Sequence, residues 1–140
     1  IHINMVDHEY CNCYIIRKIS SKISKIYDNA LKTSGLKITQ YAILKYISIL
    51  KKTNLKNLSI AMDYNRSTLG RNIRILERKK LIRFEKGKDK REVQITISND
   101  GIKIFKIARQ SWENINNQIS ENFGKNKIKM LEKILNDNIL

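Results

Sequence analysis

The spacing of the apolar residues changes along this chain, and that change limits the fold more than any other feature. Over most of the sequence apolar residues recur every three or four positions, which is typical of amphipathic α-helices. Near residue 93 the spacing changes, and Val93, Ile95 and Ile97 alternate with polar neighbours. Strict alternation indicates a half-buried β-strand. The sequence therefore predicts an α+β fold, mainly α, with a β-hairpin among its helices.

A tight pair of helices is predicted just before this hairpin. The first covers residues 55–62, and a turn at Asp63 and Tyr64 follows it. Asn65 is a good N-cap for a second helix over residues 66–79. Two helices with so short a connection indicate a helix-turn-helix.

The second helix of this pair has one apolar face and one basic face. At about 100 degrees per residue, Leu69, Ile73 and Leu76 fall on one side. The opposite side carries a hydroxyl and three guanidiniums, from Ser67, Arg71, Arg74 and Arg78. Arginine can fork onto guanine in the major groove, and a helix N-terminus favours phosphate. The pattern indicates a groove-reading helix, although a solvated basic face would give the same pattern.

Cations also cluster at the tip of the predicted hairpin. The first extended run begins at Ile82 and breaks at residues 86–90, which contain Gly87. The cations of this tip are Lys86, Lys88, Lys90 and Arg91. A lysine-rich loop is often merely exposed to solvent and has no binding role. Directly after a basic helix, however, it predicts a wing that contacts the DNA backbone or minor groove. The combination is a winged helix-turn-helix.

Longer helices are predicted on both sides of this lobe. One covers residues 11–32 and stops at Ser34 and Gly35, and Thr39 is predicted to cap the next. After the hairpin, Ser98 caps a long helix that breaks near Gly124, before a last one.

The apolar stripes of the first, fifth and sixth helices are larger than one short core requires. They predict packing against a second copy of the chain, with an intramolecular bundle as the alternative. We expect a single domain over residues 1–140. Within it, residues 1–36 and 99–140 form a helical dimerisation region, and residues 53–97 form the winged helix-turn-helix lobe.

The net charge points to a polyanionic partner. Lys and Arg number 28 against 13 Asp and Glu, which gives a formal charge of +15. Nucleic acid is favoured over a membrane surface, because no terminal basic helix with exposed bulky apolar residues stands out. The longest apolar stretch, Tyr41 to Leu50, is about half the roughly 20 residues that a membrane-spanning helix needs. With no secretory signal at the N-terminus, we expect a cytoplasmic protein.

Catalytic motifs are missing from the sequence. The histidines are His2 and His8, and we find no phosphate-binding glycine loop, metal-ligand helix motif or nucleophile elbow. We therefore expect neither an enzyme nor a bound cofactor.

The segments that carry these signals resemble the MarR (multiple antibiotic resistance regulator) family of winged-helix repressors over nearly the whole chain. They are residues 35–41 (GLKITQY), residues 65–69 (NRSTL) leading to Leu76 and Glu77, and residues 89–91 (DKR) followed by residues 93–98 (VQITIS). The resemblance implies a dimer that binds double-stranded DNA.

It also implies residue roles. Ser67, Thr68 and Arg71 would lie in the major groove, Arg91 would reach the minor groove, and Asp89 would brace the wing. The residues predicted to bind DNA are therefore Arg66, Ser67, Thr68, Arg71, Arg74, Lys88, Lys90 and Arg91.

Three positions depart from the family pattern. Ser59 stands where the family usually has alanine, Asp63 replaces the usual turn glycine, and Gly70 is often threonine in the family. Aspartate tolerates left-handed backbone geometry, so the turn should be preserved.

The two cysteines allow three interpretations. Cys13 falls where the organic-hydroperoxide-sensing branch of the family has its reactive cysteine, and Tyr27 falls where that branch has a tyrosine near the thiol of the other subunit. Arg17, which replaces a tyrosine of that branch, lies one turn from Cys13 and could stabilise a thiolate. Inert packing is the second interpretation. A metal site from His8, Cys11 and Cys13 is the third, but three ligands leave a structural zinc site incomplete, and no metal is expected.

These features predict a homodimeric transcriptional regulator, acting as a repressor on a palindromic operator. A small effector, or oxidation at Cys13 or Cys11, would release it from DNA. The alternative is an architectural protein that binds nucleic acid without sequence preference.

Overall fold

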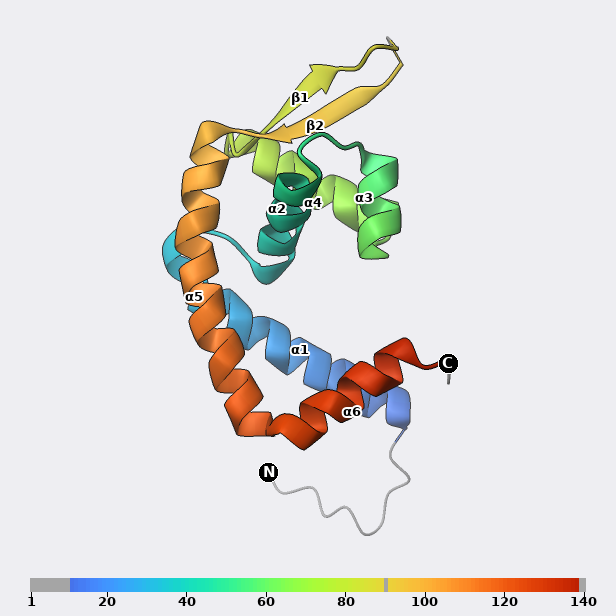
Figure 1. Ribbon diagram of the computed structural model, residues 1–140, viewed down its shortest axis with the longest axis vertical. Helices are drawn as coiled ribbons and strands as arrows, with labels where there is room; N and C mark the ends of the chain where they lie inside the picture. Colours follow the sequence, from blue (N-terminus) through green and yellow to red (C-terminus); the bar gives the residue numbers. More distant parts are fainter. Residues whose placement is uncertain (1–10, 90, 139–140) are drawn as a thin grey trace.

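The computed structural model describes residues 11–89 and 91–138. Its elements, in chain order, are α1 (Asn12–Ala30), a 3₁₀ turn (Lys32–Ser34), α2 (Ile38–Leu50), α3 (Leu55–Met62), α4 (Arg66–Arg78), β1 (Ile82–Lys86), β2 (Val93–Ile97), α5 (Asn99–Phe123) and α6 (Lys125–Asn136). Figure 1 shows α5 running along one edge of the molecule, from the part that contains α2, α3, α4 and the hairpin to the part that contains α1 and α6. The prediction of a mainly helical α+β fold with one hairpin is confirmed.

The core lies between α2, α4, the hairpin and the first half of α5. The fully buried side chains include Ile43, Leu44 and Ile47 from α2 and Leu69 and Leu76 from α4. Leu58, Ile82, Ile95 and Ala108 complete it from α3, the two strands and α5. The predicted apolar face of α4 is therefore the face that the fold buries.

The start of α2 differs from the prediction. Thr39 was expected as the N-cap, but the helix begins at Ile38 with Lys37 as its N-cap residue. Two side chains satisfy the free N–H groups there: Asp28 Oδ1 accepts from Ile38 N at 2.8 Å, and Gln40 Oε1 accepts from Lys37 N at 3.1 Å. The Asp28 carboxylate on α1 thus accepts the hydrogen bond that the Thr39 hydroxyl was expected to accept, and α2 starts two residues earlier than predicted.

The hairpin is a regular antiparallel pair of strands, and a short segment from the α2–α3 connection forms a β-bridge with it. Ile82 pairs with Ile97, and Lys86 pairs with Val93. Thr53, in the α2–α3 connection, bridges to Ile95 through hydrogen bonds of 3.2 and 2.7 Å. The hairpin is therefore anchored on α2 and α3 as well as on its own turn.

The first turn of α5 packs directly against the α4–β1 connection. Ser98 caps α5 by accepting from Gly101 N at 3.0 Å, and its hydroxyl donates to the Lys80 carbonyl at 2.7 Å. Gly101 leaves no room for a side chain, because a Cβ there would overlap the carbonyl oxygen of Leu81 and lie 2.8 Å from Ile97 Cγ1.

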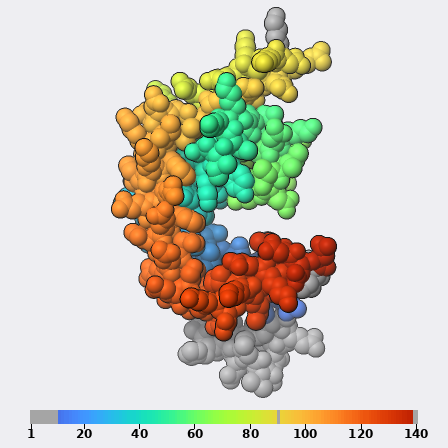
Figure 2. Space-filling view, in the orientation of Figure 1, coloured from blue at the N-terminus to red at the C-terminus, as the bar shows by residue number. Residues whose placement is uncertain are grey.

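Two of the predicted apolar stripes lie on the surface of the single chain. Neither α1 nor α6 has a buried residue. Large exposed apolar side chains on these helices are Tyr14, Ile15, Ile16, Ile19, Ile26, Met130, Leu131, Ile134 and Leu135. Figure 2 shows an open notch between α6 and the part that contains α3. Among the described residues, no helix is long and apolar enough to cross a membrane.

We expect Gly101→Ala to lower the free energy of unfolding by about 2 kcal/mol or more, since the new methyl group has to displace backbone. Urea denaturation at a fixed protein concentration measures the change. Gly70→Ala is the matched control: a Cβ at Gly70 meets nothing within 4 Å, and alanine in a helix is favoured over glycine by roughly 0.5–1 kcal/mol. Equal stability for the two variants would contradict the close packing at Gly101.

Candidate nucleic-acid interface

The turn between α3 and α4 fixes the orientation of the basic helix. Asp63 ends α3 in left-handed geometry at φ 51, so the departure from glycine is accommodated as predicted. Ser59 Oγ donates to the Tyr64 carbonyl at 2.8 Å, which ties the turn to α3. Asn65 Oδ1 then accepts from Ser67 N at 2.8 Å and caps α4, as predicted.

The outer face of α4 is exposed and cationic. Arg66, Ser67, Arg71 and Arg74 are exposed, and Thr68 is half-buried. The Thr68 carbonyl accepts from Asn72 Nδ2 at 2.9 Å, which holds Asn72 along the helix. Arg78 continues the same face in the last turn.

The guanidiniums of α4 have no carboxylate partner within the described residues. The ion pair found there joins Arg109 to Glu113 on α5, at 3.0 Å. Glu77 is the only acidic residue of α4, and it makes no ion pair in the part of the chain that is described. A face with this excess of unpaired cations is an electrostatic match for a polyanion.

The wing places further cations at the far end of the hairpin. Lys88 and Arg91 are exposed, while Lys90 lies outside the described residues, as do His2 and His8. Asp89 Oδ1 accepts from Arg91 N at 3.3 Å, and the Asp89 carbonyl accepts from Glu92 N at 2.9 Å. Both bonds lie within the tip of the hairpin, and the bracing role of Asp89 stays a prediction. Figure 2 shows the hairpin projecting from the end of the molecule that contains α2, α3 and α4.

Gly70 has no structural reason to be glycine. It is half-buried within α4, and a Cβ there would meet no atom within 4 Å. Nothing in the structure explains this departure from threonine.

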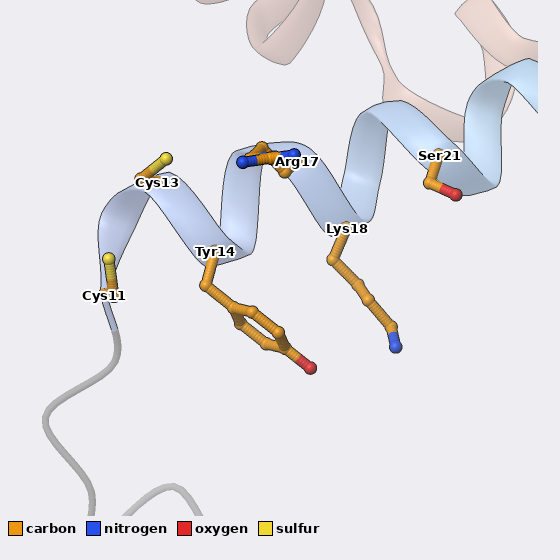
Figure 3. A pocket seen from close by; sticks show the side chains of 6 residues that line it. All are labelled: Cys11, Cys13, Tyr14, Arg17, Lys18 and Ser21. Carbon is orange, nitrogen blue, oxygen red and sulfur yellow. The ribbon is translucent and has the colours of Figure 1, made fainter.

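The predicted redox residues lie far from the basic face, on α1. Cys11 and Cys13 are both free and exposed, and with Tyr14, Arg17, Lys18 and Ser21 they line a cavity of about 440 Å³. Figure 3 shows Cys13 and Arg17 on the same side of α1, with Tyr14 and Lys18 on the other. Arg17 therefore lies one helical turn from Cys13 on the same side of α1, as the spacing predicted.

Tyr27 and Cys13 of one chain are not brought together. Cys13 lies near the start of α1, and Tyr27 lies fourteen residues on, roughly 21 Å along the helix. The Tyr27 hydroxyl donates to Asn116 Oδ1 at 2.8 Å, joining α1 to α5, and burial raises the pKa of this hydroxyl above its ordinary value. A contact between the two residues would need a second chain.

Sequence reasoning missed one junction at the end of the basic helix. Lys79, the C-cap residue of α4, donates from Nζ to the Gly35 carbonyl at 2.5 Å. These residues are 44 positions apart, and no local pattern marks their contact.

Comparison with known proteins gives consistent matches. Residues 36–93 match the model of the MarR family. The chain is 27% identical over 131 residues to the HTH-type transcriptional regulator SarZ of Staphylococcus haemolyticus, covering 90% of this chain and 88% of that protein.

The fold matches solved structures over almost its full length. The M. tuberculosis transcriptional regulator MosR, solved in complex with DNA, superimposes with a TM-score of 0.76 and 26% identity, over 94% of this chain and all of that one (100%). A mutant MarR from E. coli, solved with operator DNA, has a TM-score of 0.81 at 17% identity, covering 91% and 92% of the two chains. The second match shows the fold alone.

The relatives named above are transcriptional regulators, which agrees with the expectation of a non-catalytic protein. The wing, the capped helix-turn-helix and these matches agree: residues 36–93 are similar to the MarR family, and the chain has the fold of winged-helix regulators that were solved with DNA.

Proposed function

We propose that this protein is a homodimeric repressor that reads a palindromic operator in double-stranded DNA and is released by a small effector or by oxidation at Cys13. It acts in the cytoplasm. Residues 53–97 form the DNA-reading lobe, and residues 1–36 and 99–140 form the dimerisation region.

The exposed face of α4 carries this proposal. Its guanidiniums have no carboxylate partners among the described residues, and its N-terminus presents Ser67 and Thr68 beside Arg66. In the major groove, arginine binds the O6 and N7 atoms of guanine through two hydrogen bonds, and a hydroxyl accepts or donates as the base requires. Arg71 and Arg74 therefore specify sequence, while Lys88, Lys90 and Arg91 of the wing hold the phosphate backbone and minor groove.

A palindromic operator follows from two-fold symmetry. In a dimer the two α4 helices are related by a two-fold axis, and each reads one half-site. Successive major grooves on one side of DNA lie about 34 Å apart, which sets the spacing of the half-sites. The solved complexes of MosR and MarR with DNA support this use of the fold.

We expect Arg71→Ala to lower operator affinity by about 1–3 kcal/mol and to weaken discrimination at one base pair of each half-site. Arg91→Ala should reduce affinity and lower the slope of log K against log salt by roughly one. Fluorescence anisotropy with the protein's own upstream DNA, at several fixed salt concentrations, measures both. Lys129→Ala, an exposed cation on α6, is the matched control and should bind as wild type.

Unchanged operator affinity in Arg71→Ala and Arg91→Ala would overturn the site assignment. Excess random DNA tests the alternative function, because a specific binder exceeds its own non-specific affinity by typically 10³ or more. Binding that random competitor abolishes at once would identify an architectural protein instead.

The uncovered faces of α1 and α6 favour a dimer. We expect Leu131→Asp to raise the dimer dissociation constant by about a hundredfold or more, because a two-fold interface buries the new charge twice. Sedimentation velocity across a dilution series measures it. Ile60→Asp is the control: Ile60 is 71% exposed on α3, against 52% for Leu131 on α6, and it lies outside the proposed interface. A Leu131→Asp protein that stays dimeric would remove α6 from the interface.

The position of Cys13 favours oxidation as one means of release. A thiolate at Cys13 attacks the terminal oxygen of an organic hydroperoxide and the O–O bond breaks, which leaves a sulfenic acid on the protein; the departing alkoxide takes a proton from water and becomes an alcohol. The exposed thiol and the adjacent Arg17 support this step. Because α1 lies in the proposed dimerisation region, the new group alters packing between subunits and hence the spacing of the two α4 helices.

We expect cumene hydroperoxide to abolish operator binding by wild type and by Cys11→Ser, and dithiothreitol to restore it. Cys13→Ser should bind DNA before and after treatment. Gel shifts at fixed salt, with mass spectrometry of the thiols, follow both changes. Wild-type binding that ignores peroxide would leave a small effector as the releasing signal.

A further inference from the structure

A cavity lies where three segments distant in sequence meet, at the C-terminal end of the basic helix and apart from the cysteines. The segments are the α1–α2 connection, the α4–β1 connection and the first turns of α5. In Figure 1 the α1–α2 connection passes beside α5 at the edge of the molecule. The cavity volume is about 640 Å³, within the usual range for small-ligand sites.

The floor of this cavity is aliphatic. Leu81 is 6% exposed at its base, Ile104 is half-buried, and Ile107 is 50% exposed at its edge. None of the described residues that line it is aromatic, so these residues offer no ring for stacking against a flat ligand. Apolar contacts here are those that an alkyl chain makes best.

Two cations stand beside that floor. Lys79 and Lys103 line the cavity with one carboxylate, Asp100. Asp100 lies in the first turn of α5, where the helix N-terminus already stabilises its charge. The cavity therefore keeps an excess positive charge next to an apolar surface.

We propose that this cavity binds an aliphatic carboxylate of medium chain length. The alkyl chain covers Leu81, Ile104 and Ile107, and the carboxylate is held by Lys79 and Lys103. A carboxylate is a stronger acceptor for an ammonium group than the neutral Gly35 carbonyl that Lys79 contacts at 2.5 Å in the structure.

The bond that the ligand replaces joins two parts of the fold. Lys79 is the C-cap residue of α4, and Gly35 ends the 3₁₀ turn that follows α1. The other side of the α4–β1 connection stays fixed, because Ser98 bonds to Lys80 and Leu81. When the ligand carboxylate binds Lys79, the end of α4 loses its bond to the α1–α2 connection, and the α4–β1 connection keeps its bonds to Ser98. The effect of that release on operator binding rests on the proposed function, whereas ligand binding itself does not.

Calorimetric titration of decanoate into the full-length protein, without DNA, tests the site. We expect wild type to bind below its micelle-forming concentration with a Kd of about 1 mM or tighter. Lys103→Glu and Ile107→Glu should each bind at least about tenfold more weakly, because each places an anion at the carboxylate or alkyl position. Lys106→Glu is the matched control, since it makes the same charge change on α5 outside the cavity and should bind as wild type.

Decyltrimethylammonium, with the same chain and the opposite charge, should not bind. Equal decanoate binding by wild type, Lys103→Glu and Lys106→Glu would overturn the proposal. The proposal would also be overturned if Ile107→Glu weakened self-association and left decanoate binding unchanged. In that case a second copy of the chain, and not a ligand, would cover the cavity. Upstream-DNA binding measured with and without decanoate is a separate experiment, and its failure leaves the ligand site standing.

Discussion

The closeness of Gly101 to the α4–β1 connection is the constraint on which the DNA-reading part depends. Three parts of the chain meet at that contact: the connection that follows α4, the end of the second strand of the hairpin and the start of α5. Ser98 serves two of them at once, capping α5 and holding the Lys80 carbonyl. The connection can pass so close to α5 only because one residue there has no side chain. The direction of the wing and the direction of α5 are therefore set by the same few atoms.

Local hydrogen bonding explains why so much of the fold could be predicted from the sequence. Asn65 and Ser98 cap their helices through bonds that span two and three residues, and the alternation around Ile95 needs only the strand itself. Residue types with strong local preferences carry that information. The start of α2 could not be predicted in the same way, because Asp28, ten residues earlier on another helix, supplies its acceptor.

The candidate site shows the same division. Exposure of Arg66, Arg71 and Arg74 followed from the apolar face of α4, since residues opposite a buried stripe face the solvent. The bond from Lys79 to Gly35 and the bond from Tyr27 to Asn116 join residues 44 and 89 positions apart. Such contacts depend on how whole helices pack, and no pattern within a single segment encodes them.

The length of α5 has a mechanical consequence for DNA reading. This helix is continuous for 25 residues, so it spans about 37 Å between the two parts of the fold. In the proposed dimer each α5 works as a lever arm, and a tilt of roughly 5° at its base moves its far end by about 3 Å. That displacement is close to the rise of one base pair, about 3.4 Å. A signal that changes the tilt of α5 by only a few degrees is therefore enough to move the two DNA-reading lobes out of register with successive major grooves.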